Sequence, residues 1–153
     1  MTIELSNFAR ALLFDSKGNL AALDSDGILT KWDISNDSPK KTLAIQSVVP
    51  HFSRHAIRCS PDDEVIAVGG ANGEIWLHNM SDGRVLRTLS GHQGPVNSLA
   101  FGNSNTNLVS SAGFDEVRRW DLASEQHKTL LSKGVGLRSL CIHRGTLYVG
   151  GSE

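Results

Sequence analysis

The sequence predicts an all-β fold made of repeated four-stranded antiparallel sheets. Three segments of the chain align with one another: 28–34, 74–80 and 116–122. The repeat measures 46 residues from Trp32 to His78 and 42 residues from His78 to Trp120. No segment keeps the apolar period of an amphipathic helix over about a dozen residues. Because small four-stranded sheets must pack against neighbours to bury both faces, the predicted architecture is an array of β-propeller blades.

Each repeat contains apolar runs of strand length separated by turn residues. We expect strands at 9–14, 19–23, 28–32, 41–45, 55–59, 64–68, 74–78, 84–89, 96–101, 107–112, 117–122, 127–131, 138–142 and 146–151. Asp26-Gly27 and Asn72-Gly73 suit tight hairpin turns, because both central residues of such a turn have positive φ. The segment 60–63 suits a turn in which a proline fixes φ. We therefore expect one segment, 1–153, with blades at about 8–47, 53–90 and 91–134 and a partial blade at about 135–153, so that the ring is incomplete.

The composition argues against several classes of protein. The 153 residues carry 15 Lys and Arg against 16 Asp and Glu, and this net charge of −1 gives no general attraction to nucleic-acid phosphates. Cys59 and Cys141 are too few for a disulfide framework or a four-cysteine zinc site, and in their apolar strands we expect them to pack as small hydrophobic residues. Neither a secretory signal nor a membrane span is evident. We expect a cytoplasmic protein with no nucleic-acid or membrane partner.

Dipeptides at fixed places in the repeats identify a family resemblance. The third strands end with Trp32-Asp33, His78-Asn79 and Trp120-Asp121. The third repeat also has Gly91-His92 before its first strand, which the first two repeats lack. In this order and spacing the chain resembles the WD-repeat family, whose repeats of about 40–45 residues each form one four-stranded propeller blade. The resemblance covers essentially the whole chain, as about three and a third degenerate blades.

The resemblance implies a buried relay of hydrogen bonds in the third blade. In the family, a His, a Ser or Thr, a turn Asp and the Trp of one blade are linked. The matching residues here are His92, Ser110 or Ser111, Asp115 and Trp120. Such a relay stabilises a blade only if its buried polar groups satisfy one another. Phe114 stands where the other repeats have their turn Asp or Asn, so either this turn has lost a residue or the relay is broken.

The same residues also suggest chemistry, which we weigh against packing. His92, Ser110 and Asp115 are the residue types of a Ser-His-Asp hydrolase. The chain lacks the G-x-S-x-G motif of an exposed nucleophile, and the repeat explains these residues better, so we expect no enzyme activity. His51 and His55 are four residues apart, but they lie in a strand pattern without a nearby carboxylate. We therefore expect neither a metal nor a cofactor.

The family resemblance implies a non-catalytic scaffold that binds proteins or peptides. We define the top face as the loops that precede the first strands and those that join the second and third strands. Candidate partner-binding residues there are Arg54, Gln93, Phe114 and Arg138. Trp76 either packs against the adjacent blade or is an exposed anchor for a partner. The alternatives are a sensor or regulatory propeller portion of a larger multidomain protein, or a propeller-type hydrolase.

The predicted number of blades also bears on assembly. Three and a third blades do not close a ring, and the outer faces of the terminal blades would be apolar surfaces that drive association. Either further blades of a longer protein complete the ring, or two copies join as a homodimer. We favour the first of these hypotheses.

Overall fold

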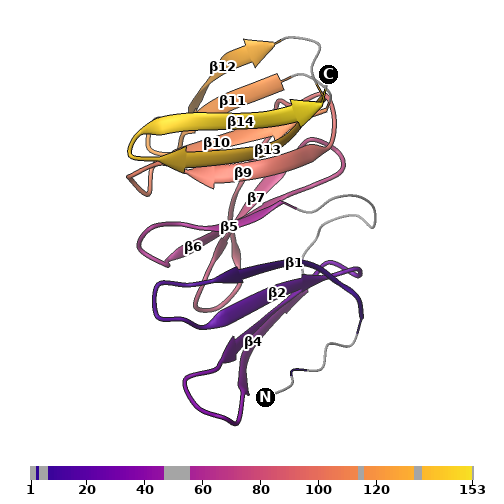
Figure 1. Cartoon of the computed structure of the whole chain (residues 1–153), viewed down its shortest axis with the longest axis vertical. Coiled ribbons are helices and arrows are strands. Elements are labelled where there is room, and N and C mark those ends of the chain that lie inside the picture. Colours follow the sequence, from indigo (N-terminus) through magenta and orange to yellow (C-terminus); the bar gives the residue numbers. More distant parts are fainter. Residues whose placement is uncertain (1–2, 4–6, 47–55, 114–115, 133–135, 153) are drawn as a thin grey trace.

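The computed structural model describes residues 3, 7–46, 56–113, 116–132 and 136–152 of the chain. Every regular element in these residues is a β-strand, which confirms the predicted all-β fold. The strands form three four-stranded antiparallel sheets and one two-stranded sheet, called blades 1 to 4 in chain order. Figure 1 shows blades 1, 2 and 3 following one another along the long axis and blade 4 packed over blade 3, in an array that is not closed into a ring.

Within each blade the strands follow the chain order, so hairpins join all neighbours. Blade 1 contains β1 (Ala9–Phe14), β2 (Leu20–Asp24), β3 (Ile28–Asp33) and β4 (Lys40–Gln46). Blade 2 contains β5 (Ile57–Cys59), β6 (Val65–Gly69), β7 (Ile75–Asn79) and β8 (Val85–Leu89). Blade 3 contains β9 (Val96–Phe101), β10 (Asn107–Ala112), β11 (Glu116–Asp121) and β12 (Gln126–Ser132). Blade 4 contains β13 (Gly136–His143) and β14 (Thr146–Ser152).

Alternate residues of each strand enter the seams between blades, because successive side chains of a strand point to opposite faces. The seam between blades 1 and 2 buries Leu13, Ala21, Leu23, Leu29, Ile57, Ile66, Val68, Trp76 and Met80. The seam between blades 2 and 3 buries Ala56, Ala67, Ile75, Leu77, Leu89, Val96, Leu99, Leu108, Ala112 and Trp120. The seam between blades 3 and 4 buries Ala100, Val109, Val117, Leu137 and Leu140. The hydrophobic core is therefore divided into layers between sheets.

The packing of these seams shows whether Trp76 and the two cysteines are buried. Trp76 is 7% exposed and belongs to the first seam, so it packs against blade 1 and is not an exposed anchor. The expectation for the cysteines is wrong for Cys141, which is exposed, while Cys59 is half-buried against the first seam. Cys141 pairs across the hairpin with the exposed Tyr148, on the side of blade 4 against which the described part of the chain packs no further sheet.

Candidate functional site

Hydrogen bonds join His92, Ser110 and Trp120 inside blade 3. His92 Nε2 lies 2.6 Å from Ser110 Oγ, and Trp120 Nε1 donates to the same oxygen at 2.7 Å. All three side chains are buried. They come from the loop before β9, from β10 and from β11, respectively, so the bonds connect the entry loop of the blade to its second and third strands.

An acidic residue other than the expected one completes this arrangement. Glu116, the first residue of β11, has Oε2 at 2.7 Å from His92 Nδ1. Its other oxygen accepts hydrogen bonds from Arg118 Nε and Thr129 Oγ1. Asp115, which the sequence argument assigned to this place, lies outside the described residues. A signal was present in the sequence, since the longer Glu side chain directly follows the aspartate and starts the third strand.

The two adjacent serines have different environments. Ser110 and Ser111 are both 0% exposed, but they point to opposite faces of β10. Ser110 lies with His92 and Trp120, whereas Ser111 Oγ has no hydrogen-bond partner among the described residues. The hydrogen bonds therefore include Ser110 and leave Ser111 out.

The protonation states let every member of this chain of hydrogen bonds be satisfied. Burial lowers the pKa of His92, and the hydrogen bond to Glu116 opposes this only in part. Burial acts to raise the pKa of Glu116, but hydrogen bonds from His92 and Arg118 outweigh it and the pKa is lowered. Neutral His92 then donates from Nδ1 to the Glu116 carboxylate and accepts the Ser110 hydroxyl proton at Nε2, a tautomer assigned from the network. Ser110 Oγ in turn accepts from Trp120.

The Ser110, His92 and Glu116 contacts have the order of a hydrolase triad, but not its accessibility. A nucleophile must reach a substrate carbon, and Ser110 is fully buried. Its oxygen also already accepts the Trp120 indole proton. A substrate could reach this oxygen only if the blade opened, so the arrangement is suited to holding strands together.

The residues that end the third strands share a second local role. In each four-stranded blade, a side-chain oxygen accepts a hydrogen bond from the backbone two positions later, in the pairs Asp33 with Ser35, Asn79 with Ser81, and Asp121 with Ala123. These backbone hydrogen bonds lower the pKa values of Asp33 and Asp121. Trp32 and His78, one position earlier, are buried in their sheets. The repeated dipeptides thus combine a packed side chain with a turn cap.

On the top face, backbone packs directly against backbone. Gly73 has a φ of +85°, and a Cβ at this position would collide with the carbonyl oxygen of His92. A Cβ on Gly94 would lie 3.0 Å from the Cα of Gly113, and Gly113 N donates to Pro95 O at 2.8 Å. The turn of blade 2, the entry loop of blade 3 and the turn of blade 3 therefore form a continuous platform.

The structure places only some of the predicted partner-binding residues. Gln93 is exposed on this platform and lines a cavity of about 540 Å³. The full lining is Gln93, Gly94, Pro95, Ala112, Gly113, Glu116 and Ser132. Arg138 is exposed on β13 and does not line this cavity. Arg54 and Phe114 lie outside the described residues. The side of His92 that contacts Glu116 therefore adjoins the cavity, which the sequence did not indicate.

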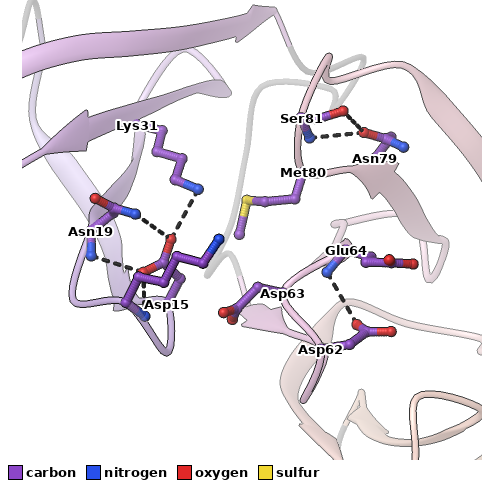
Figure 2. Close-up of a pocket in the computed structure, with 10 residues that line it drawn as sticks. Asp15, Asn19, Lys31, Asp62, Asp63, Glu64, Asn79, Met80 and Ser81 are labelled. Atoms are coloured by element: carbon purple, nitrogen blue, oxygen red, sulfur yellow. Dashed lines mark hydrogen bonds and ion pairs between the residues drawn. The ribbon is translucent and has the colours of Figure 1, made fainter.

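A second cavity, of about 500 Å³, lies between blades 1 and 2 on the opposite face (Figure 2). Lys31 Nζ lies 2.9 Å from the carboxylate of the buried Asp15. Burial acts to raise the pKa of Asp15, but hydrogen bonds from Asn19 and Lys31 outweigh it and the pKa is lowered. The carboxylate of Asp63 accepts hydrogen bonds from the backbone and hydroxyl of Ser16. Asp63, which was expected to act within its own turn, thus joins a loop of blade 2 to a loop of blade 1.

Among the residues that the structure describes, no group of three or more His, Cys, Asp or Glu side chains is arranged to hold a metal ion. In the same part of the chain, no helix has the length and hydrophobicity needed to cross a membrane.

Comparison with known proteins agrees with the fold. Residues 83–117 match the family model described as WD domain, G-beta repeat. The chain is 40% identical over 70 residues to Periodic tryptophan protein 2 homolog of Schizosaccharomyces pombe, covering 44% of the chain and 8% of that protein. It is 32% identical over 117 residues to Topless-related protein 3 of Arabidopsis thaliana, covering 73% of the chain and 10% of that protein. It is 34% identical over 114 residues to Protein tipD of Dictyostelium discoideum, covering 72% of the chain and 18% of that protein.

The successive four-stranded sheets and the seams between them define a propeller-type repeat protein. With the match at residues 83–117, which contains His92 and Ser110, the chain belongs to the WD-repeat family. It spans less than a fifth of the length of each of these three relatives.

Proposed function

We propose that the chain is a non-catalytic scaffold that binds a protein or peptide on its top face. The observation that carries this proposal is the backbone packing of Gly73 against His92 and of Gly94 against Gly113, beside the exposed Gln93. A surface held in one conformation before binding loses less conformational entropy when a partner docks. The membership of the WD-repeat family supports the same proposal.

The chain of hydrogen bonds below the platform supports this assignment. His92 follows Gly91, whose φ of +152° and close approach to Arg118 suit glycine. Its ring is held by Ser110 on one side and Glu116 on the other, so the loop that carries Gln93 is attached to the core of the blade. The relay then acts through the loop, by positioning it, and not through chemistry on a substrate.

The experiment is affinity capture from cell extract with quantification of the recovered proteins. The double variant Gln93→Trp, Ser132→Arg fills the top-face cavity, and the control Lys17→Glu changes the cavity on the opposite face. We expect partners of the wild-type chain to be lost with the double variant and retained with the control. Arg138→Glu tests the remaining described candidate on β13. Loss of the same partners with Lys17→Glu alone would contradict the proposed face, provided that circular dichroism shows all variants folded.

The outer face of blade 1 supports the proposal that further blades pack against it. Leu12 and Phe14 are exposed and lie on one side of β1, since they alternate along it, and the exposed Phe8 directly precedes this strand. Contiguous exposed apolar side chains of this kind mark association surfaces. Light scattering separates the two sources of such blades, because a homodimer has twice the chain mass of 16.5 kDa.

A further inference from the structure

His78 occupies the position at which the other four-stranded blades carry Trp32 and Trp120. It is 1% exposed, and it pairs with Ile66 on one neighbouring strand and Val85 on the other. Side-chain alternation places it on the face of β7 that also carries Trp76 and Met80, both members of the first seam. A titratable ring therefore lies in the apolar layer between blades 1 and 2.

The two ring nitrogens of His78 have different environments. Nδ1 lies 3.1 Å from the carbonyl oxygen of Gly83, which can only accept, so this nitrogen carries the proton. Nε2 is buried and has no hydrogen-bond partner among the described residues. A second proton would place an N–H group at Nε2 with no acceptor, and a buried charged group without a partner is costly.

Charged groups around the seam do not offset this cost. Alternation along the strands and the adjoining turns place the following ionisable residues around the seam: Asp15, Lys17, Lys31, Asp33, Cys59, Asp63, Glu64, Glu74, Asp82 and Arg84. β6 carries no ionisable residue, and Arg87 of β8 is bonded to Leu122 O and Glu125 of blade 3. Burial lowers the pKa of His78, opposed only by the Gly83 hydrogen bond, and no charge contributes to the shift.

We propose that His78 makes the seam between blades 1 and 2 sensitive to acid, so that protonation of Nε2 opens this seam and the cavity beside it. Met80, two positions further along the same face, packs in the seam and also lines the cavity of about 500 Å³ (Figure 2). Among the described residues, Nε2 has no acceptor within the apolar layer, so the ring would leave this layer to gain one from solvent. Tryptophan, which the other blades have here, contains no group that titrates in this range.

Proton linkage determines whether the stability of the fold rises or falls with pH. A histidine whose pKa is lower in the folded than in the unfolded chain stabilises the fold fully above the unfolded value, here 6.5, and less as the pH falls. Below pH 6.5, each pH unit increases the unfolding equilibrium constant by up to tenfold for this one proton.

The test compares urea unfolding of the full chain between about pH 4.5 and 7.5 for wild type, His78→Trp and the exposed control His143→Gln. We expect the ratio of wild-type to His78→Trp unfolding constants to rise by up to tenfold per pH unit below about 6.5. The control should follow wild type. Equal pH dependence of wild type and His78→Trp would overturn the proposal, and His92 does not affect the comparison because both chains contain it.

A second measurement needs no variant. NMR titration of the His78 ring in the wild-type chain, with hydrogen exchange of β2 and β6 at each pH, follows the proton and the seam together. We expect the ring to stay neutral while the seam is closed, and exchange in both strands to accelerate on acidification. A ring that titrates near pH 6.5 with unchanged exchange in β2 and β6 would refute the proposal, even if His78→Trp fails to fold.

Discussion

Replacing Ser110 by alanine tests the relay of blade 3 most sharply, because the adjacent Ser111 provides a matched control. Both serines are 0% exposed, so both changes remove one hydroxyl from an equally buried site. In Ser110→Ala, Trp120 Nε1 and His92 Nε2 lose their shared partner. Leaving a buried polar group unpaired costs about 1–3 kcal/mol, so two such groups cost about 2–6 kcal/mol.

Ser111→Ala removes an oxygen that has no partner, so we expect no loss of stability and even a small gain. The loss in Ser110→Ala would be a large fraction of the roughly 5–15 kcal/mol by which domains are stable. Urea denaturation at pH 7, followed by tryptophan fluorescence, measures both free energies of unfolding. If the two variants were destabilised equally, or if Ser110→Ala changed stability by less than about 0.5 kcal/mol, the assignment of the relay would be refuted.

Three further predictions concern the platform, the acidic member of the relay and the first seam. Gly73→Ala should lower the thermal stability more than Gly18→Ala does. The two φ angles of +85° and +81° impose similar strain on alanine, but only Gly73 faces the His92 carbonyl. Equal losses in thermal melts would argue against close packing of the platform. Glu116→Gln should be less stable than wild type at pH 7 and equally stable in strong acid. The lowered pKa of Glu116 stabilises the fold above pH 4.5, and this contribution is lost as the pH falls. A difference in unfolding free energy that persists at low pH would contradict this prediction. Leu23→Ala should cost about 2–5 kcal/mol because Leu23 is fully buried in the first seam, whereas Leu12→Ala on the exposed side of blade 1 should change little; similar losses in denaturant titrations would argue against this seam.

The strands could be predicted because their signals are local. The expected strands 96–101 and 107–112 coincide with β9 and β10, since alternating apolar residues and turn residues are visible within a few positions. The positive φ of Gly27 and Gly73 was likewise implied by the dipeptides that contain them. The expectation of positive φ is wrong for Asp26 and Asn72, so neither turn has the two positive φ angles of the expected tight hairpin. Secondary structure in this chain is therefore largely set by short-range patterns.

The contacts between elements could not be predicted in the same way, because they depend on how far side chains reach in three dimensions. Among the described residues, the acidic partner of His92 is Glu116, which does not stand at the expected turn position. Asp63 was expected to act in its own turn, but it accepts from Ser16 in a different blade, 47 positions away. The burial of Trp76 and the exposure of Cys141 depended on which side of each strand faces a neighbouring sheet.

The central claim is that a partner docks on the top face, and hydrogen exchange of the chain with and without a captured protein tests it most directly. We predict slower exchange on binding in the loops 70–73 and 91–95, which form the platform. Unchanged exchange there, together with protection of the opposite-face loops 15–19 and 60–64, would contradict the account.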